Sequence, residues 1–212
     1  MNRKPTGDHQ QYPGGLPGAY TAPPESLTTG SAKGSAAGSA SGSSAGGSKS
    51  TTALLLVSTV LLGLMAGLFF AFDVSVMPGL AAGDEHTYVI AMRSFNKAID
   101  GNGLFGMAFV LALLVSAASA VIEFRRGRRG VAVWVGVACV TYLIVLVITF
   151  AVNIPLNNEL ADAGDVAKMT DFSVVDTFKG TWVAANIMRT VLCTAALTAL
   201  SRALVLYGRA TR

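Results

Sequence analysis

Apolar residues gather into four long blocks that short polar segments separate. The blocks cover residues 53–72, 104–122, 131–152 and 182–206. Each can cross the roughly 30 Å apolar layer of a bilayer as a helix, which takes about 20 residues. Inside lipid a chain must satisfy its own backbone hydrogen bonds, and helices do so within one segment. The pattern therefore predicts an all-α fold, a four-helix transmembrane bundle.

A shorter amphipathic segment follows the first block. Asp84 suits the N-cap of a helix that begins at Glu85, and Gly101 suits its end. Apolar side chains recur there at helical spacing, at Tyr88, Met92, Phe95 and Ile99. The segment is too short and too charged to be a span. We expect it to pack its apolar stripe on the outer mouth of the bundle, like a lid.

The first 50 residues differ from the rest in composition. They are rich in Gly, Ser, Ala and Pro and have few side chains able to build a core. We therefore divide the chain into a disordered cytoplasmic tail over residues 1–50 and a four-span domain over residues 51–212. A flexible leader is the simpler interpretation of the tail, and a binding role is the alternative.

Composition and charge agree with a membrane protein. Charged residues make up 13% of the chain and mean hydropathy is +0.54, whereas soluble domains carry about 25% charged residues. Four arginines lie between the second and third blocks, while the other two connections are acidic. The positive-inside rule then predicts a multi-pass protein of the cell membrane with both termini cytoplasmic. Because the arginine loop already has this orienting role, we expect the lipid bilayer and not nucleic acid as its partner.

The sequence lacks the residue patterns of thiol-redox, zinc and haem sites. Cys139 and Cys193 lie at different depths within spans, with no CxxC motif, and suit apolar packing. His9 falls in the tail and His86 is a lone loop histidine, so we expect no metal and no cofactor.

Gly63 and Gly67 form a GxxxG spacing. We interpret it as packing within the bundle, with a homo-oligomer as the alternative.

Polar residues inside the apolar blocks are the best candidates for functional residues, because placing them in lipid costs free energy. Arg189 lies well inside the fourth block, where a charge is costly unless it faces the interior and finds a partner. Trp182, Asn186 and Arg189 share one helical face. Asp73, at the end of the first block, is the predicted partner of Arg189. The alternative is that Arg189 snorkels to the headgroups and Asp73 is an interface residue.

The third block ends in the sequence TFAVNIPLNNEL. Asn153 and Asn157 are four residues apart, and Pro155 between them should end the helix. Asn96 borders the apolar stripe of the amphipathic helix. These asparagines and the stripe of Arg189 belong to the same end of the bundle, so we expect a polar pocket capped by aromatic rings. The alternative is that each asparagine only caps a helix.

Four segments together resemble the anthrone oxygenase-like family of small membrane proteins. The resemblance covers about residues 55–206, includes Pro78, and rests on GLFFAFDVSVMPGL, AMRSFNKAI, NIPLNNEL and WVAANIMR. It implies four spans and, from characterised members, oxidation of anthrones to anthraquinones without metal or flavin. By position, the motifs are matched by Asn153, Asn157, Trp182, Asn186, Arg189 and Asn96. We expect catalytic roles for Arg189, Asp73, Asn153, Asn157 and Asn186, and substrate contacts for Trp182, Asn96 and His86. Arg189 and the asparagines would stabilise an enolate oxygen, while Asp73 or His86 would move a proton.

Two functions fit this sequence. One is a cofactor-independent monooxygenase that acts on a lipophilic, anthrone-like aromatic molecule. The other is a non-catalytic membrane protein, whether a ligand-binding, transport-associated or partner subunit, whose polar cluster serves bundle packing. Conduction is disfavoured because the cytoplasmic halves of the blocks are almost purely apolar.

Overall fold

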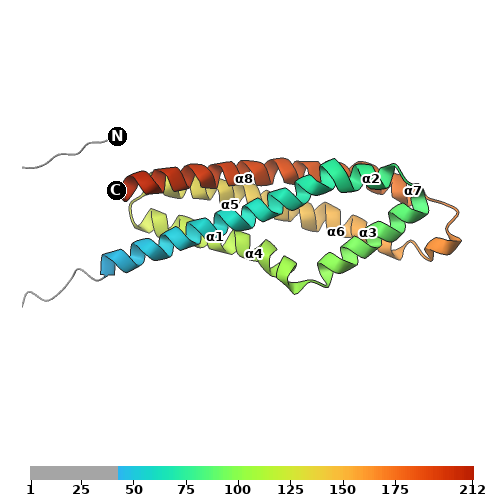
Figure 1. Cartoon of the computed structure of the whole chain (residues 1–212), viewed down its shortest axis with the longest axis horizontal. Coiled ribbons are helices and arrows are strands. Elements are labelled where there is room, and N and C mark those ends of the chain that lie inside the picture. The colour runs from blue at the N-terminus through green and yellow to red at the C-terminus, as the bar shows by residue number, and fades with distance from the viewer. Residues whose placement is uncertain (1–42) are drawn as a thin grey trace, which may run out of the picture. The chain divides into compact units, whose positions relative to one another are not determined.

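A computed structural model describes residues 43–212, and these form a bundle of long helices without a strand (Figure 1). The predicted all-α fold is therefore confirmed for this part of the chain. Most of the predicted disordered tail, residues 1–42, lies outside the described residues. Residues 43–50 already belong to the first helix, which begins ten residues before the predicted span.

Four long helical rods run through the bundle, three of them interrupted by one π-helical turn. The first rod joins α1 (Ser43–Ala71), η1 (Phe72–Val76) and α2 (Met77–Ala81), and the second is α4 (Gly103–Arg125). The third joins α5 (Arg129–Ile148), η2 (Thr149–Asn153) and α6 (Ile154–Asp162). The fourth joins α7 (Ser173–Thr177), η4 (Phe178–Trp182) and α8 (Val183–Ala210), after the short η3 (Val166–Lys168). Each rod contains one predicted span, so the chain is a multi-pass membrane protein.

The rods pack in a ring, with α1 beside α4 and α8, and α5 beside α4 and α8. Their shared core is built from small and branched residues such as Leu62, Ala112 and Ala196, all fully buried. Large apolar side chains such as Val60 and Val140 cover the outside. An apolar exterior suits contact with lipid chains instead of water. The bundle surface thus meets the bilayer.

The amphipathic helix forms as predicted and lies across one end of the bundle, which we call the α3 end (Figure 1). Helix α3 (Glu85–Asp100) starts at Asp84, whose Oδ1 accepts a hydrogen bond from Thr87 N at 2.9 Å. Tyr88, Val89 and Met92 are buried in a second apolar cluster with residues from α2, α6, α7 and η4. Of the predicted stripe, Phe95 is instead 39% exposed and Ile99 is partly buried. The helix therefore covers this end of the bundle through the first half of the stripe.

Pro155 does not end the third helix, contrary to our prediction. The helix continues to Asp162 because a π turn precedes the proline. Ile154 N–H donates to Thr149 O, five residues back, so the hydrogen-bond register has already shifted where the proline lacks its N–H. The first rod repeats this arrangement, since Met77 N–H donates to Phe72 O just before Pro78. Both prolines are thus accommodated inside continuous rods.

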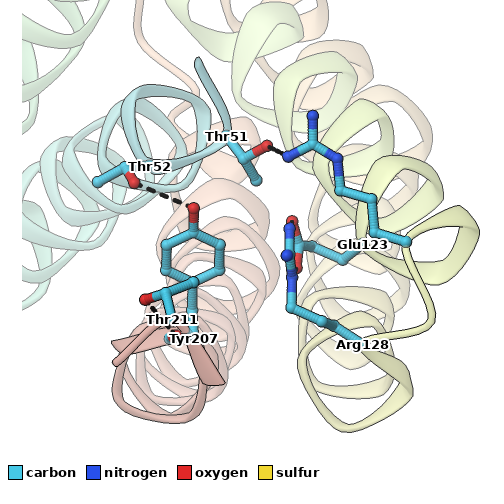
Figure 2. Close-up of polar contacts among 7 residues, drawn as sticks. Thr51, Thr52, Glu123, Arg128, Tyr207 and Thr211 are labelled. Atoms are coloured by element: carbon cyan, nitrogen blue, oxygen red, sulfur yellow. Dashed lines mark hydrogen bonds and ion pairs between the residues drawn. The ribbon is translucent and has the colours of Figure 1, made fainter. Parts of the chain in front are cut away.

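A polar cluster holds the opposite end, which we call the arginine-loop end after residues 125–129. Figure 2 shows Glu123 and Arg128 side by side, next to the ring of Tyr207. Arg128 donates to both carboxylate oxygens of the fully buried Glu123, and its guanidinium carbon lies 5.1 Å from the Tyr207 ring centroid. Thr52 donates to the Tyr207 hydroxyl at 3.2 Å. These contacts link α1, α4 and α8 with the loop residue just before α5, where the rods end.

Candidate functional site

A cavity of about 320 Å³ lies near the α3 end, between helices from all four rods and α3. Six aromatic rings line it, from Phe69, Phe72, Phe105, Phe109, Phe150 and Trp182. Its polar lining consists of Asn96, Asp100, Asn102, Thr149, Asn153, Asn157, Asn186 and Arg189. An apolar cavity with a few convergent polar groups is the usual form of a small-molecule site.

Arg189 is the buried cation of this cavity, with 5% of its surface exposed. Its Nη2 donates to Asn186 Oδ1 at 2.7 Å, and its Nη1 donates to Thr149 Oγ1 at 3.3 Å. The guanidinium carbon lies 4.4 Å from the Phe69 ring centroid and 5.5 Å from that of Trp182. Aromatic faces at these distances attract a cation. Arg189 therefore faces the interior of the bundle and does not extend toward the headgroups.

Asn186 connects Arg189 to Asp73, so the direct ion pair that we predicted is not formed. The Asn186 amide nitrogen donates to Asp73 Oδ1 and, at 3.0 Å, to Phe69 O, while its oxygen accepts from Arg189. Asp73 Oδ2 accepts from Thr190 Oγ1 at 2.5 Å. Asp73 is not among the residues that line the cavity. Its negative charge thus acts on Arg189 through one intervening amide.

Two asparagines of the third rod, Asn153 and Asn157, reach the fourth rod. Trp182 Nε1 donates to Asn157 Oδ1 at 2.8 Å, which fixes the orientation of the indole ring. Asn153 Nδ2 donates to Trp182 O at 3.4 Å. That carbonyl belongs to the η4 π turn, and Asn153 itself belongs to η2. Both asparagines thus bind across the cavity wall instead of only capping their own helix.

Three π turns border the cavity, and each contributes lining residues. Phe72 comes from η1, Thr149, Phe150 and Asn153 come from η2, and Trp182 comes from η4. Single π turns inside α-helices are frequent at functional sites, because they change which side chains face inward. Sequence periodicity at 3.6 residues missed Thr149, Phe72 and Phe150, which lie in these turns, for this reason. A proline two residues after each of η1 and η2 is the signal that could have indicated them.

Three polar atoms in the lining are buried without a hydrogen-bond partner. They are the donors Arg189 Nε and Asn96 Nδ2 and the acceptor Asn153 Oδ1. A buried polar group without a partner costs about 1–3 kcal/mol. The three residues that carry these two donors and one acceptor all line the cavity.

The remaining predicted residues lie in different places. Asn96 lines the cavity from α3. His86 is at the far end of α3, with its ring centroid 4.8 Å from that of Phe172, and is not among the lining residues. Asp100, which our sequence analysis did not select, lines the cavity one helical turn after Asn96. The four-residue spacing from Asn96 could have indicated it.

A polar groove continues from the cavity toward the α3 end. Asn96, Asp100 and Asn157 line both the cavity and this groove, which also includes Arg93 and Lys97. Arg93 donates to Leu160 O at 2.9 Å and to Gly164 O at 2.8 Å, which fastens α3 to the end of α6. Asp100 thus lies where the cavity meets a polar surface.

One comparison with known proteins gives a match. A family model described as anthrone oxygenase matches residues 92–199, about half of the chain. The matched segment contains Asn96, Asn153 and Arg189 but not Asp73 or His86. No curated protein and no solved structure matches the chain.

Proposed function

Since the chain belongs to the anthrone oxygenase family, we propose that it is a cofactor-independent oxygenase of a lipophilic, anthrone-like aromatic molecule. The observation that carries the proposal is the aromatic cavity with two unpartnered donors and one unpartnered acceptor. Flat rings match its six aromatic side chains, and ring oxygens match its free polar atoms. The substrate dissolves in the bilayer that surrounds the bundle.

The reaction balances without a further reagent. The ring CH₂ group of the anthrone loses a proton, and its electron pair moves onto the ketone oxygen as an enolate. The enolate carbon gives these electrons to dioxygen, and with one proton a C–O bond and a hydroperoxide form. Loss of the second C–H proton together with hydroxide breaks the O–O bond and yields the second ketone. Anthrone and dioxygen thus become anthraquinone and water.

Arg189 is the group that stabilises the enolate in this proposal. A buried cation with a free Nε donor stabilises negative charge that develops on a nearby oxygen. Asn96 supplies the second donor, and Asn153 accepts a hydrogen bond from a hydroxyl on the ring system. Asn157 orients Trp182, and Asn186 orients Arg189. Asp73, through Asn186, supplies the counter-charge.

Asp100 is the proposed proton acceptor in place of His86 or Asp73. Among the described residues that line the cavity, it carries the one carboxylate. It also lines the polar groove, so a proton taken from the substrate can pass on to water. Asp73 already accepts hydrogen bonds from Asn186 and Thr190, which suits a fixed counter-charge better than a proton carrier.

The alternative is a non-catalytic protein whose polar cluster holds the bundle together. One observation favours it, namely that Asp73 and Phe69 O of the first rod bind Asn186 and Thr190 of α8. This cluster joins two rods whether or not any chemistry takes place beside it. A non-catalytic protein would also bind an aromatic ligand in the same cavity.

Oxygen uptake by purified protein with anthrone separates these functions. We expect uptake by the wild type and a loss of at least about a hundredfold in Arg189→Ala, a typical effect of removing one oxyanion donor. Asp100→Asn should lower the rate mainly at neutral pH and less in alkaline solution, where hydroxide removes the proton. Arg202→Ala, an exposed arginine of the same helix, is the matched control and should keep full activity.

Arg189→Lys covers the case in which the alanine variant does not fold. It keeps a charge but loses the Nε donor, so it should fold and still be slow. If folded wild type consumes no oxygen with any of several anthrones, the oxygenase proposal is wrong. If Arg189→Lys is as fast as wild type, Arg189 is not the oxyanion donor.

We further propose that both termini are cytoplasmic, so that the α3 end faces outward. The four arginines of the loop between α4 and α5 support this orientation. A membrane-impermeant maleimide should label Asp165→Cys in intact cells, since the Asp165 side chain is 58% exposed at the α3 end. Thr211→Cys, at the other end of the bundle, should react only after lysis. The reverse pattern would overturn the orientation.

A further inference from the structure

The cavity lining includes exposed residues at membrane depth. Val110 of α4 and Phe150 of η2 both line it, yet 45% and 58% of their surfaces are exposed. Val110 lies about 10 Å along α4 from Gly103, at a rise of about 1.5 Å per residue. Both residues belong to helices that are long and apolar enough to span the membrane. At this depth an exposed side chain meets lipid chains and not water.

We propose that the cavity opens sideways into the bilayer between α4 and η2, and that its ligand enters from the lipid through this opening. The inference rests on the proposed function only in taking the ligand to be a lipophilic ring system. We call the opening the side portal and define it by Gly103, Gly106 and Val110 on α4, with Phe150 and Ile154 opposite. All five are apolar.

Two glycines keep the α4 side of the portal open. Gly103 and Gly106 are exposed, line the cavity and lie on the same helical face as Val110. A Cβ atom placed on either glycine would meet no heavy atom within 4 Å. Any larger side chain there would extend into open space instead of into packed structure. Because Gly103 and Gly106 have no side chains, the α4 side of the opening stays wide.

Buried polar atoms behind the portal indicate a ligand. Arg189 Nε and Asn153 Oδ1 are unpartnered, and their residues are 5% and 1% exposed. Both residues line the cavity that the glycines border. A site that only packed helices together would satisfy such groups within the protein. The portal therefore leads to two buried residues that carry unpartnered polar atoms.

The polar groove is the less suitable path for such a ligand. Arg93, Lys97 and Asp100 line it, and each is hydrated when it faces water. A lipophilic molecule concentrates in the bilayer and would have to leave it to reach this groove. The two openings therefore differ in chemistry. The ligand enters through the apolar side portal, and protons and water pass through the polar groove.

Stopped-flow fluorescence can test the portal without any turnover. The chain has two tryptophans, so Trp134→Phe leaves Trp182 in the cavity as the single reporter. The probe is anthraquinone, already oxidised, dissolved in vesicles that are mixed with the protein in nanodiscs. Gly106→Leu should slow the quenching of Trp182 by about tenfold, equivalent to about 1.4 kcal/mol in the barrier. Gly103→Leu is a second portal variant with the same expected result.

Two matched variants control for general effects. Gly136→Leu adds the same side chain to α5, where a Cβ also meets no atom within 4 Å but no cavity lies. Ala161→Phe narrows the polar groove. Both should leave the quenching rate unchanged. If Ala161→Phe slows quenching and the two portal variants do not, the ligand enters through the groove and the portal is wrong.

Failure of the portal and failure of the proposed function give different results. If anthraquinone quenches Trp182 and the two portal variants slow this quenching, but wild type consumes no oxygen, the oxygenase proposal is wrong and the portal stands. If wild type consumes oxygen but quenching is equally fast in wild type and both portal variants, the portal is wrong and the oxygenase proposal stands. No quenching by folded wild type shows that the ring does not bind in the cavity, and overturns the portal.

Discussion

At the scale of single residues, Asn186 organises the site more than its charged neighbours do. A side-chain amide has both a donor and an acceptor, so it can bind a carboxylate and a guanidinium together. Asn186 does this between Asp73 and Arg189 and also donates to Phe69 O. Opposite charges alone favoured a direct ion pair between Asp73 and Arg189. That prediction ignored the Asn186 side chain, which lies between the two groups.

Replacing Asn186 tests this role. Asn186→Leu keeps the approximate volume but removes all three hydrogen bonds, and it leaves buried polar atoms on Asp73 and Arg189. We expect the free energy of unfolding to fall by about 1–3 kcal/mol, the cost of unsatisfied buried groups. Unfolding followed by circular dichroism in detergent measures it. Asn158→Leu, on the exposed face of α6, should change stability by less than about 0.5 kcal/mol; equal effects would contradict the role.

Sequence reasoning reached much of the site at this scale. Arg189, Asn186, Trp182, Asn153, Asn157 and Asn96 all line the cavity that was expected where the asparagines gather. Each is a polar or amphipathic group in an apolar context, which the sequence displays directly. Asp100 and Thr149 did not stand out, because carboxylates and hydroxyls near helix ends are common. The direction in which the Thr149 side chain points is set by the π turn η2, which the sequence does not display. Asp100 lies in the regular helix α3, one turn after Asn96.

At the scale of elements, the capping of α3 couples the cavity cover to pH. Hydrogen bonds from the backbone and side chain of Thr87 lower the pKa of Asp84 below its usual 3.8. The folded-state pKa is thus below the unfolded one, so the stabilisation is present above about pH 4 and is lost as pH falls through the folded value. Acidification should therefore loosen the start of α3.

Asp84→Asn separates this effect from general acid unfolding. Asparagine caps helices about as well as aspartate but does not titrate. Hydrogen exchange of the α3 amides, measured at about pH 3 and about pH 7, should show acid loss of protection in wild type and much less loss in the variant. Both proteins are compared at equal pH, so intrinsic exchange rates cancel. The same acid loss in both would show that Asp84 is not responsible.

The rods show where periodicity predicts elements and where it does not. Long apolar runs predicted all four spans, because burial in lipid leaves helices as the available structure. The extent of α3 was predicted from its cap at Asp84, its amphipathic spacing and Gly101 at its end. Helix ends were less predictable. Pro155 looked like a stop because the usual rule treats the proline alone, whereas the π turn before it shifts the hydrogen bonds by one residue. Local sequence gives little indication of that compensation.

At the scale of the whole molecule, the two ends of the bundle carry different polar systems. The α3 end has unpartnered polar atoms around a cavity. At the arginine-loop end the carboxylate of Glu123 is fully buried and accepts hydrogen bonds from Arg128; Figure 2 shows the two side chains next to each other. Satisfied polar groups suit a structural clamp, while unsatisfied ones suit a ligand site. The molecule thus separates its clamp from its cavity along the length of the rods.

Glu123→Gln tests whether the two ends are independent. It removes the partner charge of Arg128, so the free energy of unfolding should fall, by less than about 3 kcal/mol because Arg128 is 22% exposed and can reach water. Quenching of Trp182 by anthraquinone should keep its wild-type affinity, because the cavity is lined by residues toward the α3 end, whereas Glu123 and Arg128 lie at the arginine-loop end. Arg125→Gln, an exposed arginine of the same loop, should change neither quantity. If Glu123→Gln weakens anthraquinone binding as strongly as it weakens the fold, the clamp positions the cavity and the two ends act as one unit.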